Sequence, residues 1–210
     1  MGITGVMQSI LRFFAEGTGN LAWAIIIVTT LIRAALHPLQ VKQVRLMEQM
    51  KEITPKVQEL EKKYKGQPEE YQRRVAELYR DNNVNPAVGC LSMLIPLPFF
   101  VIFYRVLQDT AFIGGMPEAA KGFLWIKDFA LPDPWALPIL SAVTTWLSSR
   151  QTATDPSQKS MAIIMPIFMG WIAMRMPAGA ALYWVTNNLI SVVQQWLIQR
   201  QLAAAKKGVS

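Results

Sequence analysis

An arginine lies inside an apolar stretch of this chain, with no acidic residue close to it. Arg33 stands in "TTLIRAALHPL", residues 29–39, and the nearest acidic residues are Glu16 and Glu48. If the stretch crosses a membrane, a charge there costs about 2.5–3.5 kcal/mol on insertion scales, and such charges are usually paired. Arg33 therefore either snorkels to headgroups at the nearby membrane surface, or lies in a wet cavity that awaits a negative charge from another molecule.

The wet-cavity explanation predicts further polar side chains at membrane depth, and a later apolar stretch has them. Residues 178–199, "AGAALYWVTNNLISVVQQWLIQ", carry more amides than a lipid-facing helix needs. On a helix, side chains at i, i+3 and i+4 share a face, although some of these groups would also bond neighbouring helices. We predict a groove that opens to the cytoplasm, lined by Arg33, Thr29, Thr30, Tyr183, Asn187, Ser191 and Gln194.

No set of residues fits catalytic chemistry, and the apolar stretches contain no Asp or Glu. The single histidine, His37, is typical of an interfacial residue. Ser92 in "GCLSML" lacks the glycine-flanked pattern of a nucleophile, and no glycine-rich phosphate loop is present. Cys90 is the only cysteine, which excludes an internal disulfide and a cysteine metal cluster. We predict no catalytic residue, no metal site and no cofactor.

The elements that must position this groove are apolar stretches separated by charged loops. Of the 210 residues, 52% are hydrophobic and 17% charged, a balance typical of a membrane protein. A crossing helix needs about 20 residues. The third and fourth stretches are shorter and could form a re-entrant hairpin, but a bilayer thins at modest cost and we favour spans. The five predicted transmembrane helices are Leu21–Leu39, Pro86–Gln108, Trp135–Ser149, Met161–Met174 and Ala178–Ile198.

The positive charges predict the orientation of these helices. Fifteen Lys and Arg residues fall in loops on one side and four on the other, so the positive-inside rule places the N-terminus outside and the C-terminus in the cytoplasm. The basic side would also suit anionic lipid or RNA. Residues 1–18 read as an amphipathic interfacial helix on the outer face, and we expect a signal or anchor to precede a chain with this orientation.

The long insert after the first stretch predicts a helical hairpin. Gly66 and Pro68 in "KGQP" are typical of a helix end followed by a new helix start, and Thr54 with Pro55 predicts an end or bend of the first helix. The hairpin is either a solvated coiled coil or a docking surface. Its apolar seam has spacings of three and four residues: Leu46, Met50, Ile53, Val57, Leu60 and Tyr64.

The predicted fold class is thus an all-α polytopic membrane protein with five transmembrane helices, a cytoplasmic helical hairpin and a short N-terminal interfacial helix. Its segments are the interfacial helix 1–18, the first transmembrane helix 20–40, the cytoplasmic hairpin 41–85, the second transmembrane helix 86–108, an outer-face loop 109–134, the third to fifth transmembrane helices 135–198 and a cytoplasmic tail 199–210.

The order and spacing of several segments between about residues 20 and 200 resemble the YidC-type membrane protein insertases, which have mitochondrial and chloroplast relatives. The resemblance implies a five-helix core around a hydrophilic groove with one basic residue, which here matches Arg33, while Thr29 and Tyr183 match groove positions. The segments are "LIRAALHPL", "TPKVQELEKKY", "NPAVGCLSMLIPLPFFVIFYRVL", "FLWIKDFALPDP" and "MAIIMPIFMGWIAMRMPAGAALYWVTNNLISVVQQW".

The resemblance also implies a function: insertion of nascent membrane proteins into a bacterial inner membrane, without covalent chemistry. Implied partners are nascent membrane proteins, the lipid bilayer, the Sec translocon, the ribosome and the signal recognition particle machinery, with a monomer expected. Alternatives are a translocon-associated chaperone or assembly factor that does not insert proteins alone, and a small-solute channel. A lipid-facing slide for substrates, or else ordinary packing, is expected of Met93, Met161, Met165 and Met169.

Overall fold

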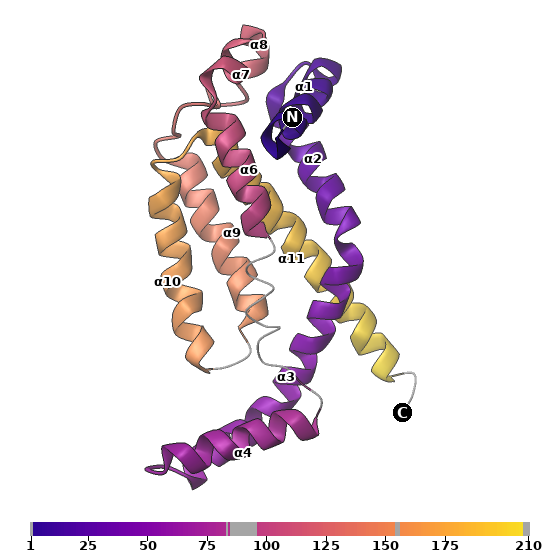
Figure 1. The fold of residues 1–210 in the computed structure, drawn as a ribbon, viewed down its shortest axis with the longest axis vertical. Coiled ribbons are helices and arrows are strands. Elements are labelled where there is room, and N and C mark those ends of the chain that lie inside the picture. The colour runs from indigo at the N-terminus through magenta and orange to yellow at the C-terminus, as the bar shows by residue number, and fades with distance from the viewer. Residues whose placement is uncertain (1, 83, 85–95, 154–155, 208–210) are drawn as a thin grey trace.

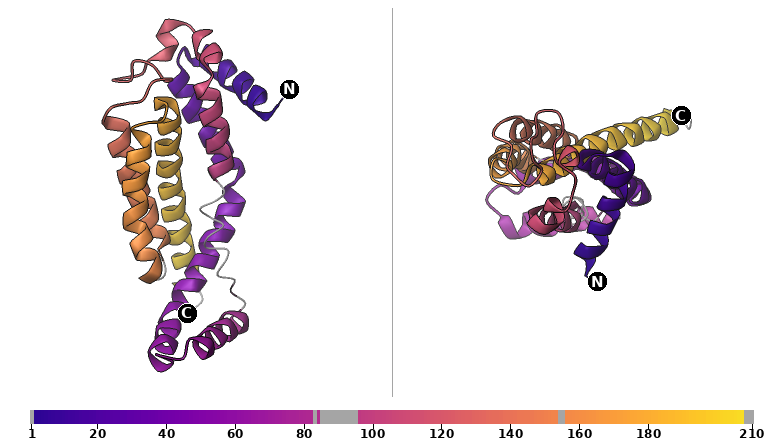
Figure 2. Two further views of the ribbon diagram at one scale, coloured as in Figure 1. Left: turned by 60° about the vertical axis from the view of Figure 1, so that its left-hand side comes forward. Right: turned by 90° about the horizontal axis from the view of Figure 1, so that it is seen from above.

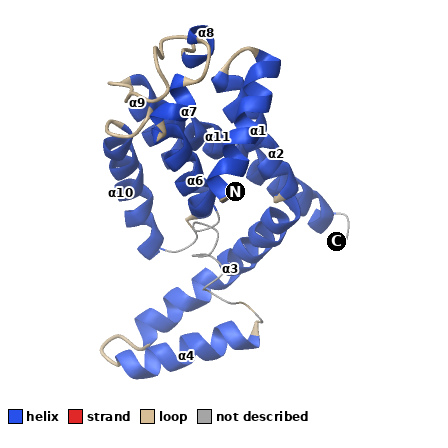
Figure 3. Cartoon of the chain, turned by 45° about the horizontal axis from the view of Figure 1, so that its top comes forward, coloured by secondary structure: helices blue, strands red, loops and turns tan. Residues whose placement is uncertain are grey.

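The computed structural model describes residues 2–82, 84, 96–153 and 156–207, and within these ranges all regular elements are helices (Figure 3). This confirms the predicted all-helical class. The helices are α1 (Ile3–Thr18), α2 (Leu21–Ala35), α3 (His37–Lys63), α4 (Pro68–Asp81), α6 (Pro96–Gln108), α7 (Thr110–Gly114), α8 (Glu118–Lys121), α9 (Ala136–Thr152), α10 (Pro156–Ala173) and α11 (Ala178–Lys207).

The long helices form a bundle with smaller elements at its two ends (Figures 1 and 2). α10 packs against α9, α9 against α11, and α11 against α2, α6 and α3. The short helices α7 and α8 lie with α1 at one end, and the α3–α4 hairpin extends from the other (Figure 1). α11 therefore contacts four other described helices: α2, α3, α6 and α9.

The first predicted transmembrane helix is not continuous, which corrects the expectation of one helix from Leu21 to Leu39. α2 ends at Ala35 and α3 begins at His37, with only Leu36 between them and a bend of 63°. Pro38 lies in the first turn of α3. Because proline lacks an N–H and its ring clashes with the carbonyl four residues earlier, it starts a helix more readily than it continues one.

Length and hydropathy bear on the number of membrane crossings. Within the described residues, no helix taken singly is both long enough and apolar enough to cross a membrane, whereas the bent pair α2 and α3 together meets that requirement. Two shorter apolar helices, Pro96–Gln108 and Ser160–Ala173, are also present. The count of five spans stays a prediction.

Other boundaries differ from those predicted. α11 continues to Lys207, so most of the predicted tail is helical. α3 runs through Pro55, and the Thr54 hydroxyl donates to the Met50 carbonyl at 2.9 Å. Of the predicted end or bend at this point, the end was therefore wrong, and the bend stays a prediction. In the second predicted span, α6 accounts for Pro96–Gln108, whereas residues 86–95 lie outside the described part of the chain.

The main core joins α1, α2, α6 and α11. The rings of Phe103 and Tyr183 stack with their centroids 4.4 Å apart, and both side chains are almost fully buried. Gly179, at the start of α11, lies where an added Cβ would come within 2.9 Å of Leu107 and 3.4 Å of Ile25. The close approach of α2, α6 and α11 at this point therefore depends on a residue without a side chain.

α1 behaves as an amphipathic helix with two apolar edges. Leu11 is fully buried against the core, while Phe13 is 71% exposed. The Gln8 amide donates to the Asp109 carboxylate at 2.8 Å, and this bond, with backbone N–H groups of α7, lowers the pKa of Asp109 below its ordinary value. α1 is thus fixed to the bundle, while an apolar edge faces outward, as an interfacial helix requires.

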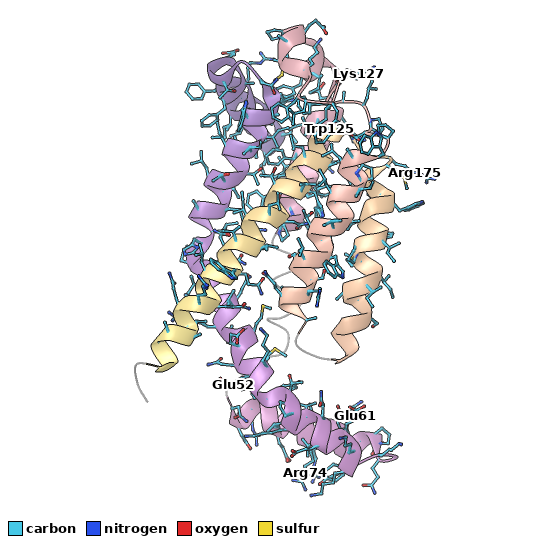
Figure 4. All side chains as sticks on the ribbon, turned by 180° about the vertical axis from the view of Figure 1, so that it is seen from behind. Glu52, Glu61, Arg74, Trp125, Lys127 and Arg175 are labelled. Atoms are coloured by element: carbon cyan, nitrogen blue, oxygen red, sulfur yellow. The ribbon has the colours of Figure 1, made fainter. Side chains whose placement is uncertain are left out.

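α3 and α4 fold back on each other and bury a second, smaller core. Met50, Ile53 and Val57 of the predicted seam pack there with Val75 and Leu78 of α4. The charged surface of the hairpin includes Glu52, Glu61 and Arg74, while Trp125, Lys127 and Arg175 lie at the opposite end of the molecule (Figure 4). The predicted hairpin is therefore present, and its cytoplasmic location stays a prediction.

The turn between α3 and α4 contains Gly66, and we predict that replacing this glycine loosens α4. Gly66 has φ +94°, a region that costs other residues about 1–2 kcal/mol. We expect Gly66→Ala to speed hydrogen exchange of the backbone amides of α4 roughly 5- to 30-fold. The control is Gly17→Ala, since Gly17 also has open space around it but lies in α1 without a positive φ. Equal exchange in the wild type and Gly66→Ala would contradict the prediction.

Candidate functional site

A cavity of about 360 Å³, part of it open to solvent, lies among α2, α3, α6 and α11 close to the bend at Leu36. We call it the Arg33 pocket. It brings together four of the seven predicted groove residues from two distant parts of the sequence. Its lining residues are Thr29, Ile32, Arg33, Leu36, Leu39, Gln40, Gln43, Pro96, Phe99, Tyr183 and Asn187.

Arg33 is held in this pocket by neutral groups. Its Nε donates to Oδ1 of Asn187 at 2.8 Å, and its Nη1 donates to Oε1 of Gln40 at 3.1 Å. Among the described residues it makes no ion pair with a carboxylate. Amide oxygens orient the guanidinium without cancelling its charge, so the pocket presents a net positive charge.

The Arg33 bonds and those of Gln194 connect α2, α3 and α11 around the bend. Gln194 Nε2 donates to the Arg33 carbonyl at 3.3 Å and lies 3.5 Å from Nδ1 of His37. One turn further along α11, Gln199 donates to the Glu48 carboxylate at 3.3 Å. The amides of α11 therefore hold both sides of the joint, with His37 serving as a contact at the start of α3.

Tyr183 and Thr29 form the deep wall of the pocket. Tyr183 is 2% exposed, and its hydroxyl donates to the Pro96 carbonyl at 3.3 Å. Thr29 is 1% exposed and donates to the Ile25 carbonyl in its own helix at 2.6 Å. Their hydroxyl donors are thus engaged, while each oxygen keeps capacity to accept a hydrogen bond.

Three predicted groove residues lie elsewhere. Thr30 is exposed, and its hydroxyl bonds the Ile26 carbonyl of its own helix. Ser191 and Gln194 are half-buried on α11 but do not line the Arg33 pocket. Gln194 reaches the site through the Arg33 backbone, as described above.

The predicted methionine slide is divided by the fold. Met161 is 54% exposed on α10, Met165 is half-buried, and Met169 is only 6% exposed. Met93 lies outside the described residues. Of the three described methionines of the predicted slide, only Met161 is therefore exposed.

Sequence reasoning missed the contribution of α3 to the pocket. Gln40 and Gln43 are three residues apart, so they share a helix face, and both line the cavity. Their spacing after Pro38 was a signal, but the stretch was read as the start of a hairpin and not as a wall of the site.

A second polar cluster lies between α9 and α11, separate from the pocket. Oγ1 of Thr145 accepts hydrogen bonds from Trp184 Nε1 at 2.9 Å and from Asn188 Nδ2 at 3.0 Å. Nearby, Gln195 donates to the Gln151 carbonyl at 3.1 Å. These amides join helices, which is the alternative role that the sequence left open for part of this stretch.

The groups that line the Arg33 pocket are suited to binding through charge and hydrogen bonds. The described residues contain no group of three or more His, Cys, Asp and Glu that could hold a metal ion. The pocket offers a guanidinium, amides and phenol and hydroxyl oxygens between apolar walls. Such a surface suits a polar or anionic segment that must leave water without losing its hydrogen bonds.

Comparison with known proteins gives a consistent set of relatives. The family model described as "60Kd inner membrane protein" matches residues 13–206. A protein named "Membrane protein insertase YidC" from Caldanaerobacter subterraneus subsp. tengcongensis is 41% identical over 202 residues, covering 95% of this chain and 95% of its own. A Helicobacter pylori protein of the same name is 35% identical over 221 residues, covering 98% of this chain and 40% of its own.

A solved structure is also similar. It is described as "Active YidC insertase crystal structure with the first transmembrane domain resolved", and it matches with a TM-score of 0.72 and 30% sequence identity. The match covers 90% of this chain and 45% of that one. This chain thus spans nearly the whole length of the first relative and less than half of the Helicobacter pylori protein and of the solved chain.

Proposed function

This chain belongs to the 60Kd inner membrane protein family, that of the YidC-type membrane protein insertases, and from this premise we propose that it inserts nascent membrane proteins into the bacterial inner membrane. The observation that carries the proposal is the Arg33 guanidinium, held by Asn187 and Gln40 with its charge not neutralised by a described carboxylate. A charge of this kind is costly in a membrane, and charged residues inside membrane segments usually have a functional role.

The proposed mechanism lowers the barrier for the polar flank of a substrate. That flank enters a hydrophilic groove of which the Arg33 pocket is the described part, so that it need not cross the full hydrocarbon thickness without hydrogen-bond partners. Arg33 attracts acidic flanks transiently, while Tyr183 and Asn187 supply polar atoms. Thr29 offers its hydroxyl oxygen in the deep wall of the pocket. Thr30, Ser191 and Gln194 add polar groups to the neighbouring helix faces.

The apolar segment of the substrate supplies the driving force. It moves along the outside of the bundle and partitions into lipid, because transfer of apolar surface out of water is favourable. α10 offers a surface of suitable chemistry, with Met161, Ile164 and Phe168 exposed. The slide therefore uses Met161 and its exposed neighbours, with Met165 at its edge, and the contribution of buried Met169 is to packing.

The orientation and partners follow from the same proposal. Five spans place the N-terminus outside and the C-terminus in the cytoplasm, with the charged α3–α4 hairpin on the cytoplasmic side. There the hairpin meets ribosomes and signal recognition particle machinery, and the bundle works as a monomer, alone or with the Sec translocon. No covalent step, metal or cofactor enters the mechanism.

Reconstitution tests the proposal. The purified chain alone is placed in sealed vesicles, and a single-span test protein with an acidic tail is added; insertion is read as protection of the tail from external protease. We expect protection that protein-free vesicles do not give. Insertion only after the Sec translocon is added would show an assembly factor instead, and leakage of small solutes through the vesicles would show a channel.

A further inference from the structure

The bonds of the Arg33 guanidinium to the described residues leave some of its donors unused. A guanidinium carries five N–H groups in a planar fork. The bonds to Asn187 and Gln40 use one on Nε and one on Nη1, which leaves the second N–H of Nη1 and both of Nη2. The two bonds that are made fix the plane of the fork, so the remaining N–H groups keep a defined direction.

A buried amide in the same pocket also lacks a partner. Gln43 is 6% exposed and is one of the lining residues, and its Nε2 has no acceptor among the described residues. A buried donor left unsatisfied destabilises a fold, so such groups are rare unless a ligand or water completes them. Gln43 lies on α3, one turn after Gln40, whereas Arg33 lies on α2.

Two kinds of donor, one of them cationic, therefore line one cavity from two helices. An anion with several acceptor sites suits both donors and also balances the charge of Arg33, and a carboxylate has two oxygens with about four lone-pair sites. Charge-assisted bonds to guanidinium are shorter and stronger than neutral ones.

We infer that Gln43 is a second substrate-binding residue, which with Arg33 binds the carboxylate of an acidic flank in the nascent protein. The inference rests on the proposed function and adds to it a residue on the far side of the bend. Arg33 supplies the charge, and Gln43 supplies a neutral N–H. A carboxylate is favoured over a backbone carbonyl because its negative charge strengthens the bonds from both donors, the one from the guanidinium most.

Binding in detergent tests this inference without any insertion step. The full chain is titrated with a fluorescent peptide whose flank carries glutamates, and with the same peptide carrying glutamines. We expect Gln43→Met, which keeps the length of the side chain but removes the donor, to lower the ratio of acidic to neutral affinity roughly 3- to 10-fold. The matched control is Gln49→Met, on the exposed surface of the same helix, which leaves the ratio unchanged.

A second variant covers the case in which Gln43→Met does not fold. Gln43→Glu keeps the shape of the side chain and offers Arg33 a carboxylate from within, so the affinity ratio must fall at least as far as in Gln43→Met. An unchanged ratio in the folded variant, or an equal loss for both peptides, overturns the inference. So does a Gln43→Met effect confined to short-chain phosphatidic acid, which would make the pocket a lipid-phosphate site.

The binding and insertion results separate the two proposals. A lowered ratio in a chain whose wild type inserts nothing would keep the carboxylate site and reject the proposed function. Insertion by the wild type, together with an unchanged affinity ratio in Gln43→Met, would keep the proposed function and reject the carboxylate site. Where both hold, Gln43→Met slows insertion of the acidic-tailed protein 3- to 10-fold and leaves that of a glutamine-tailed protein within twofold.

Discussion

Arg33→Ala lowers insertion of an acidic-tailed single-span protein by tenfold or more in vesicles that contain only this chain; tenfold corresponds to about 1.4 kcal/mol. The reason is that alanine removes the one charge in a pocket where Asn187 and Gln40 are neutral partners. Arg33→Lys loses the planar fork of the guanidinium. It retains most of the activity, because it keeps the positive charge that attracts the acidic tail. The rate of protease protection of the tail measures the effect.

The control for the Arg33→Ala experiment is a change in the tail of the substrate. A glutamine-tailed version of the same protein has no charge for Arg33 to attract, so Arg33→Ala slows it much less. If all three chains insert the acidic tail equally well, the arginine serves only to hydrate the pocket, and the mechanism must depend on groove polarity and on thinning of the bilayer.

Thr145→Val lowers the stability of the bundle by about 1–2 kcal/mol, because it leaves two buried donors short of an acceptor. Both Trp184 and Asn188 donate to the Thr145 hydroxyl oxygen, and within the described part of the chain only Asn188 has a further acceptor, Thr144, at 3.4 Å. Valine has nearly the same shape as threonine, so little packing is lost. A fall of about 3–8 °C in the midpoint of thermal unfolding in detergent is expected.

Thr152→Val is the matched control for this change. Thr152 lies on the same helix, α9, and its hydroxyl bonds the carbonyls of Ser148 and Ser149 within that helix. Its removal breaks no bond between helices, so the unfolding midpoint stays within about 1 °C. A midpoint in Thr145→Val as high as in Thr152→Val would show that the cluster between α9 and α11 contributes nothing to stability.

The sequence predicted the helical class well, but it predicted only some of the residues that surround Arg33. Apolar stretches and heptad spacing depend on local sequence, and they predicted both the helical bundle and the seam of Met50, Ile53 and Val57. Asn187 was correctly grouped with Arg33, because an uncompensated charge requires polar neighbours. Its neighbour Asn188 points about 100° away around the helix, so it bonds α9 instead.

The bend at Leu36 hid the rest of the site. Read as one straight helix, the first apolar stretch ends in lipid headgroups, and Gln40 and Gln43 belong to a solvated insert. The 63° change of direction turns their shared face back toward α2 and α11. Pro38 signals a helix start but does not predict the angle. The α11 residues that contact the two sides of the bend, Gln194 and Gln199, are far away in the sequence.

The one-residue joint at Leu36 also has a mechanical consequence. Met50, in the hairpin core, lies fourteen residues beyond Leu36 and Gln40 only four, or about 21 Å and 6 Å along a helix. α3 is thus a lever with a ratio of about 3.5: a rigid swing that moves Met50 by about 5 Å moves Gln40 by about 1.5 Å. That smaller displacement is enough to break the 3.1 Å bond from Arg33 to Gln40. In the proposed mechanism, a load on the hairpin would therefore free one more N–H of Arg33 to bind the acidic flank of the substrate.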